Sequence, residues 1–212
     1  IIVNTLLLSF YSLIVIPFSL LLALGLNWVA NLRYKRIVQT VTYAPHFIST
    51  VVMVGMMAVL LNRVTGPVNR LIEGFGGEAV YFFGRADLFR HLFVWSEVWQ
   101  RAGWNAVIFL AALSGVNPEL YESARMDGAT KLRLLWHIDL PSIRPTVTVV
   151  ALLAIGRVMK VNFEKVLLMQ TPLNTETSEI IQTFVYKTGL LQFDVGYATA
   201  VGLFNSVVNA IL

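Results

Sequence analysis

Five long apolar runs, separated by polar segments, dominate the pattern of this chain. Each run reaches the roughly 20 residues that a helix needs to cross the hydrocarbon core of a bilayer. The first run carries no charged residue and would form a helix about 39 Å long at about 1.5 Å per residue. The sequence therefore predicts five membrane-spanning helices, at residues 4–29, 38–61, 91–115, 146–169 and 194–212.

Prolines and glycines punctuate this pattern. Pro45 falls inside the second predicted span and should bend or open it, because proline cannot donate the helical hydrogen bond. The loop at 62–90 is rich in glycine, and Leu71 and Ile72 suggest one short interfacial helix within it. A second polar loop, 170–193, precedes the last span.

Composition supports an integral membrane protein. Hydrophobic residues make up 57% of the 212 positions and charged residues only 13%, which favours a polytopic helical protein over a soluble domain. The net charge of +4 is spread along the chain, so the lipid bilayer is an expected partner and nucleic acid is not. Ile1 is not an initiator residue and Leu212 lies inside an apolar run, so we expect residues 1–212 to be a single transmembrane domain truncated at both ends.

A polar elbow at 117–141 interrupts the second half of the chain. Asn117 is a favourable N-cap and Pro118 a favourable first helical residue, so a short helix should begin here. Gly128 should end it, since glycine adopts the left-handed conformation without steric cost. Leu132, Leu135 and Trp136 recur at helical spacing beyond that glycine, which predicts a second amphipathic helix that Pro141 and Pro145 stop.

The elbow carries the residues of a known signature. The pattern is Glu-Ala-Ala, three residues, Gly, nine residues, Ile, one residue and Leu-Pro, and the positions that match it are Glu122, Ala124, Gly128, Ile138, Leu140 and Pro141. Ser123 replaces the usual second alanine, while Asp127 and Ala129 fit the extended form. The chain therefore resembles the membrane subunits of binding-protein-dependent ABC importers.

That resemblance implies a fold, a site and partners. The expected fold is the all-α, type I importer bundle, with 117–141 as a cytoplasmic coupling loop in a bacterial inner-membrane protein. The implied partners are a second homologous permease subunit, expected in a heterodimer although an identical partner is the alternative, two ATPase subunits that use ATP and Mg, and an extracytoplasmic solute-binding protein. The residues expected to couple to the ATPase are Tyr121, Glu122, Ser123, Ala124, Met126, Asp127, Gly128, Ala129, Leu132 and Pro141.

Orientation follows from alternation of the spans. The Lys and Arg count is seven for the 33–36 loop and the whole 116–145 loop that contains the elbow, and five for the other two loops. This difference decides little, but the three cations at 33–36 next to a span end favour the cytoplasmic side. The resemblance implies the same side for the elbow.

Charges inside predicted spans define a second candidate site. Each would cost about 2.5–3.5 kcal/mol if it faced lipid. Glu97 can pair with Arg101 one turn later, and Arg157, Lys160 and Glu164 would form one stripe on the fourth span. Two interpretations remain open: an ion-pair network that fixes helix packing, or a substrate path lined by Glu97, Trp99, Arg157, Lys160 and Glu164. Lys165 is expected to extend toward the outer interface.

The substrate class rests on resemblance. Residues 162–169 and 197–204 are similar to carbohydrate importers of the oligosaccharide branch, and the similarity covers most of 95–212. Arg157 and Lys160 add the hypothesis of an acidic oligosaccharide such as a uronate polymer. Trp95 and Trp99 lie one turn apart and could stack on sugars, although interfacial or packing roles are the commoner use of tryptophan.

The sequence offers no chemistry of its own. It has no phosphate-binding Gly-x-x-x-x-Gly-Lys-Ser/Thr motif, so ATP hydrolysis is expected in a partner and no cofactor on this chain. His46, His91 and His137 are far apart, and no catalytic or metal site is predicted. The alternatives are a permease of the same type for another solute, an ion-gradient-driven secondary transporter, and a structural membrane scaffold.

Overall fold

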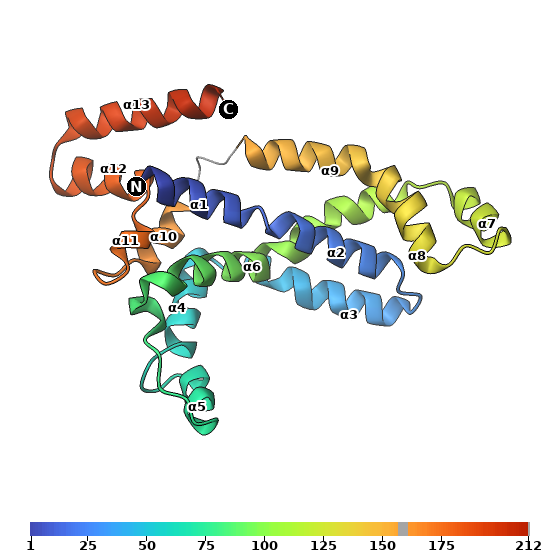
Figure 1. Cartoon of the computed structure of the whole chain (residues 1–212), viewed down its shortest axis with the longest axis horizontal. Helices are drawn as coiled ribbons and strands as arrows, with labels where there is room; N and C mark the ends of the chain where they lie inside the picture. The colour runs from blue at the N-terminus through green and yellow to red at the C-terminus, as the bar shows by residue number, and fades with distance from the viewer. Residues whose placement is uncertain (157–160, 212) are drawn as a thin grey trace. The chain divides into compact units, whose positions relative to one another are not determined.

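The regular structure is helical throughout the described part of the chain. The computed structural model describes the backbone of residues 1–156 and 161–211, and the side chains of 1–156 and 161–208. Helices are the only regular elements in these ranges, as predicted (Figure 1). They form two compact units, one of Leu13–Phe47 and Glu97–Ile155 and the other of Ile1–Ser12, Ile48–Ser96 and Gly156–Leu212.

The first of these units holds the elbow. Its elements are α2 (Val15–Asn27), α3 (Leu32–Tyr43), a 3-10 turn (Ala44–Phe47), the second part of α6 (Ala86–Ser114), α7 (Pro118–Met126), α8 (Lys131–Leu134), a π-helical turn (Leu135–Asp139) and α9 (Leu140–Ile155). Side chains from α2, α6 and α9 build its core, namely Ala23, Leu24, Ala106, Phe109, Leu113 and Ile143. These three helices therefore form the body on which α7 and α8 are mounted.

Helix α3 approaches α6 very closely at one point. A Cβ atom on Gly103 would lie 2.0 Å from the backbone oxygen of Thr42, so only glycine permits this approach. The next residue of α6 is Trp104, whose ring stacks on that of His46 with centroids 4.6 Å apart. Phe47 meets the same tryptophan edge-on. Trp104 therefore contributes to packing in this unit.

The other unit is assembled from three separate stretches of chain. Its elements are α1 (Ile2–Ser12), α4 (Thr50–Leu60), α5 (Pro67–Gly74), a 3-10 turn (Phe82–Gly84), the first part of α6, α10 (Phe163–Met169), α11 (Thr175–Ser178), α12 (Ile181–Tyr186), a π-helical turn (Lys187–Leu191) and α13 (Val195–Ile211). Helix α10 packs against α4, and α12 against α13. The side chain of Lys165 is 1% exposed. Its Nζ donates to the carbonyl of Phe93 at 2.6 Å and lies 4.3 Å from the centroid of that ring, so the prediction that it extends to an interface is wrong.

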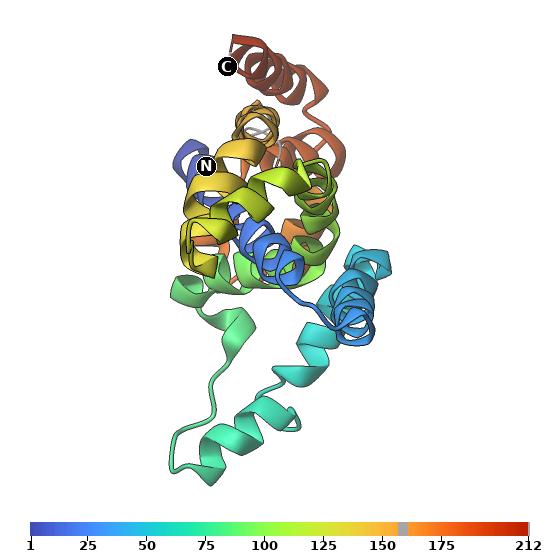
Figure 2. The same ribbon diagram turned by 90° about the vertical axis from the view of Figure 1, so that its right-hand side faces the viewer.

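The glycine-rich loop at 62–90, called the 62–90 arm below, carries α5, which is the short helix predicted around Leu71 and Ile72 (Figure 2). One buried side chain, Asn69, holds the base of the arm. Its amide nitrogen donates to the carbonyls of Asn62 and Val80, both at 3.0 Å, and its oxygen accepts from the Val80 N–H at 2.8 Å. Most residues from 70 to 78 are exposed, including Phe75 at 90%.

Fewer helices qualify as membrane spans than the five predicted. By length and composition, the described residues contain two, Ile2–Asn27 with 26 residues and Lys131–Ile155 with 25. A third is gained if Leu32–Phe47 and Thr50–Leu60 count as one broken span. The interruption follows the turn that contains Pro45, as expected from its missing N–H. Helix α6 is 29 residues long but is not among the qualifying helices, and it carries Glu97 and Arg101 in its middle.

The predicted fourth span is wrong at both ends. Pro141 and Pro145 do not stop a helix, because α8, the π-helical turn and α9 follow one another without a gap. The π-helical turn is closed by a Leu140 N–H to Leu135 carbonyl bond, and this wider turn gives room for a proline ring that would clash in a regular α-helix. The same helix ends at Ile155, and Asn162 caps a separate helix, α10.

Candidate functional site

The first arm of the elbow is a helix capped at both ends by local sequence. The Asn117 side chain accepts from the Glu119 N–H at 3.0 Å, and Pro118 follows at the first helical position, as predicted. At the other end the Ala129 N–H donates to the Ala124 carbonyl and the Gly128 N–H to the Arg125 carbonyl. This pair of bonds is the Schellman arrangement, which needs a left-handed residue. Gly128 supplies it with φ of +74°.

The second arm starts from its own cap. The Thr130 hydroxyl accepts from the Arg133 N–H, and α8 then runs into the π-helical turn. Leu134 is 2% exposed and anchors the arm, whereas Leu132 and Trp136 are more than 60% exposed. The buried face therefore differs from the one that the helical spacing of Leu132, Leu135 and Trp136 predicted.

Most of the predicted coupling residues lie at the surface of the elbow. The exposed ones are Glu122, Ser123, Met126, Asp127, Gly128, Leu132 and Pro141, and the half-buried ones are Tyr121, Ala124 and Ala129. Met126 is 89% exposed, which is unusual for a large apolar side chain on a short helix. Leu132 is a second exposed apolar residue of the elbow, at 65%.

One carboxylate, Asp139, lies fully buried behind the elbow. Its Oδ1 accepts from the Tyr121 hydroxyl at 2.5 Å, and its Oδ2 from Nε1 of Trp28 at 2.8 Å. Burial raises the pKa of Tyr121 above its ordinary value, and the neighbouring Asp139 adds to that shift. The hydroxyl therefore stays protonated and donates across the physiological range. An open hollow of about 420 Å³, lined in part by Glu122 and Arg125, adjoins this cluster.

The structure supports only part of the predicted charge stripe. Glu97 and Arg101 form the expected i,i+4 pair, with an Nη1 to Oε1 distance of 3.4 Å. Arg157 and Lys160 lie outside the described residues, so their predicted place in a substrate path stays a prediction. Glu164 is exposed in the first turn of α10, and residues 161 and 162 before it are not helical. A continuous helix from 146 to 169 carrying one stripe is therefore wrong.

The chain is similar to known transport proteins over nearly its whole length. Residues 15–212 match the family of binding-protein-dependent transport system inner membrane components. The chain belongs to this family. The permease is 44% identical over 210 residues to the polygalacturonan/rhamnogalacturonan transport system permease protein YteP of Bacillus subtilis (strain 168). The aligned residues cover 99% of this chain and 65% of that protein. It is also 44% identical over 210 residues to protein LplB of the same organism, covering 99% and 66%.

Solved structures give the same relationship. The permease matches a chain of a bacterial ABC transporter involved in the import of the acidic polysaccharide alginate, with a TM-score of 0.96 and 40% identity over 99% of this chain and 74% of that one. A second match is the alginate transporter in complex with its alginate pentasaccharide-bound periplasmic protein, with a TM-score of 0.95 and 39% identity over 99% and 73%. The permease therefore shares the fold of importer membrane subunits, while it spans just under two thirds of the two Bacillus relatives.

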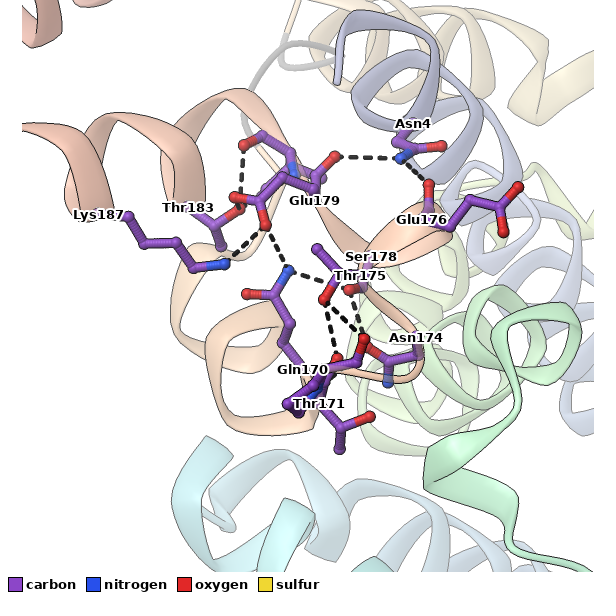
Figure 3. Close-up of polar contacts among 12 residues, drawn as sticks. Asn4, Gln170, Thr171, Asn174, Thr175, Glu176, Ser178, Glu179, Thr183 and Lys187 are labelled. Carbon is purple, nitrogen blue, oxygen red and sulfur yellow. Dashed lines mark hydrogen bonds and ion pairs between the residues drawn. The ribbon is translucent and has the colours of Figure 1, made fainter.

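A network of polar side chains fixes the 170–187 segment of the permease, as Figure 3 shows. At its centre the Asn174 amide donates to the carbonyls of Phe83 and Met169 at 2.9 and 3.0 Å. Its oxygen accepts from the Thr171 N–H and the Ser178 hydroxyl, both at 2.9 Å. Asn174 is 0% exposed, so the bonds are shielded from water. The predicted polar loop at 170–193 therefore contains helices α11 and α12 and a buried set of hydrogen bonds.

A second cluster in Figure 3 surrounds Glu179. One carboxylate oxygen accepts from Lys187 Nζ at 2.6 Å and from the Gln170 amide at 2.9 Å, and the other from the Thr183 hydroxyl at 3.0 Å. The Asn4 amide, from α1, donates to the backbone carbonyl of Glu179 at 3.2 Å. The segment is thus tied to the start of the chain.

The roles of Asp139 and of the Asn174 network, and the burial of Lys165, were not predicted from the sequence. For the network a signal was present, since 170–179 is a dense run of residues that form side-chain to backbone bonds. For Asp139 no local signal exists, because Trp28 is 111 positions away.

Proposed function

We infer that this chain is the membrane-spanning permease subunit of an ATP-driven importer for acidic oligosaccharides in a bacterial inner membrane. It would form the translocation path with a second permease, receive sugar from a solute-binding protein and couple through 117–141 to two ATPase subunits. The observation that carries this proposal is similarity along 99% of the chain both to a polygalacturonan/rhamnogalacturonan permease and to a subunit of an alginate importer. Both named substrates are polymers that carry carboxylates.

The geometry of the elbow supports the coupling role. A helix capped at both ends and closed by a glycine turn moves as one body, whereas a flexible loop would absorb displacement. Its exposed apolar residues, Met126 and Leu132, could fill a groove of the ATPase, and Glu122 could make the polar contact. The chain's own residues hold and position this surface, while ATP and Mg would bind to the partner.

Uptake by the purified importer, reconstituted in liposomes with its copurifying partners and binding protein, tests the proposal. An oligogalacturonide should accumulate when ATP is supplied inside, and a neutral oligosaccharide of equal length should accumulate at least about tenfold less, as expected for loss of one charge-assisted contact. Ionophores that collapse ion gradients should have no effect. Uptake that followed an ion gradient without ATP would instead identify a secondary transporter.

A double substitution tests whether Arg157 and Lys160 cause the preference for acidic sugars. Arg157→Gln combined with Lys160→Gln should reduce the preference for the charged sugar while leaving neutral uptake in place. Unchanged selectivity in that variant would remove Arg157 and Lys160 from the substrate path.

A further inference from the structure

Helix α7 is held to the body of its unit by very little. None of its residues is buried, and the hollow lined by Leu113, Pro118 and Arg125 separates part of it from the ends of α2 and α6. Leu120 is 48% exposed and Met126 89%. Tyr121 is the residue of α7 whose side chain reaches inward to a fully buried partner.

That partner, Asp139, connects three elements through one carboxylate. It lies in the π-helical turn between α8 and α9, within the apolar helix Lys131–Ile155. Trp28 is the C-cap residue of α2, at the end of the apolar helix Ile2–Asn27. The two helices of the described chain that are long and apolar enough to span a membrane therefore meet α7 at this side chain.

The chemistry of the contact makes it stiff. A buried carboxylate is costly unless its oxygens are hydrogen-bonded, and within the described residues Asp139 has no ion-pair partner. Its two donors, an indole N–H and a phenol O–H, are both neutral and both come from rings with few rotatable bonds. The rings of Trp28 and Tyr121 also meet edge-on, with centroids 6.2 Å apart and planes at 81°. Movement of α7 away from this cluster would strand a buried charge.

We propose that Tyr121, Asp139 and Trp28 form a clamp that transmits displacement of α7 to α2 and α9. This proposal rests on the proposed function, and it makes Asp139 a positioning residue that acts through Tyr121. Breaking the clamp should leave an assembled importer in which α7 moves without carrying the spans. ATP hydrolysis would then continue while sugar transport falls.

The test measures the number of ATP molecules hydrolysed per sugar imported by the reconstituted, complete importer. Tyr121→Phe removes one hydroxyl and Asp139→Asn removes the charge while keeping the shape. Each should raise this ratio about tenfold, the effect expected for losing one hydrogen bond to a charged group. The double variant should be no worse than the single ones, because all three break the same contact. Tyr34→Phe is the matched control, since Tyr34 is 57% exposed on α3, and its ratio should equal that of the unchanged protein.

Three results would overturn the clamp. One is an unchanged ratio in Tyr121→Phe when the unchanged protein couples ATP to uptake. Another is multiplication of the two single effects in the double variant, which would mean independent roles. The third is a lower yield of assembled importer with a normal ratio per assembled complex, which would indicate a contact that serves folding alone. Failure of the proposed function is distinct, because the unchanged protein would then transport without ATP.

Discussion

At the scale of single residues, Gly128 sets the geometry of the elbow through its backbone alone. Its φ is +74°, and a Cβ atom placed on it would meet nothing within 4 Å. Space is therefore not the constraint. Any residue other than glycine or asparagine at position 128 would have to adopt a left-handed backbone conformation that costs about 1–2 kcal/mol.

We expect Gly128→Pro to abolish coupling. Proline fixes φ near about −65° and removes the N–H that bonds to the Arg125 carbonyl. The variant should insert in the membrane in normal amount but transport less than about a tenth of the sugar. Gly128→Asn is the control, because asparagine tolerates the left-handed conformation, and it should keep most of the transport. Equal transport by the proline variant and the control would contradict the coupling assignment of the turn.

Asn174 shows the opposite case, because its side chain and not its backbone conformation holds the surrounding segment. Asn174→Ala would remove four hydrogen bonds and leave buried partners such as the Phe83 carbonyl unsatisfied. We expect a loss of about 3 kcal/mol in the free energy of unfolding, measured by thermal unfolding in detergent. Asn31→Ala removes an exposed helix cap and should cost only about 1 kcal/mol. A smaller loss for Asn174→Ala than for Asn31→Ala would contradict the importance of the network.

What could be predicted at this scale was what depends on neighbours in sequence. The caps at Asn117 and Gly128 follow from local rules, and the structure confirms both. Trp28, one partner of Asp139, and Phe93, the partner of Lys165, come from distant parts of the chain, so no spacing rule pointed to them. Lys165 in particular lies beside Phe93, 72 positions away.

At the scale of helices, the approach of α3 to α6 depends on the absence of one methyl group. The atom nearest to a Cβ on Gly103 is a backbone oxygen, which cannot rotate away as a side chain could. The two helices can separate only by moving as bodies. Their contact is therefore specified by Gly103 more strictly than by the apolar residues around it.

Gly103→Ala should destabilise the protein by about 1–3 kcal/mol, the usual cost of overpacking. The shift in the thermal unfolding midpoint of the purified importer measures it. Gly25→Ala is the matched control on α2, where a new Cβ would meet nothing within 4 Å, and it should leave stability unchanged or slightly higher because alanine favours a helix. A similar loss in both variants would mean that helix propensity or lipid contact decides, not the α3–α6 approach.

Helix boundaries were the weakest part of the sequence prediction. Local rules assign prolines to helix ends, but the π-helical turn before Pro141 lets the helix continue to Ile155. Conversely, the apolar composition of 146–169 concealed the cap at Asn162. An apolar run shows that a segment can enter lipid, whereas hydrogen-bond geometry decides where its helix starts.

At the scale of the whole molecule, sidedness stays a prediction. Alternation of the five spans expected from the sequence would put the elbow on the cytoplasmic side and the 62–90 arm on the other. Residues 1–212 contain no cysteine, so single cysteines introduced there can report each side without background from this segment. Met126 and Phe75 are suited to this, at 89% and 90% exposure.

We expect a membrane-impermeant maleimide applied to intact spheroplasts to label Phe75→Cys and not Met126→Cys. After the membrane is opened and partner subunits are stripped, both positions should react, because both side chains are exposed. Labelling of Met126→Cys from outside would reverse the orientation and with it the proposed coupling to a cytoplasmic ATPase.

The hydrogen bonds of Asn69 at the base of the 62–90 arm have a practical consequence. Because the fastening lies at the root, residues farther out contribute little to holding the segment in place. An epitope or small fluorescent protein inserted between Gly77 and Glu78 would leave the hydrogen bonds of Asn69 at the base of the arm intact. The permease could then be purified or imaged through this insertion while its helices stay undisturbed.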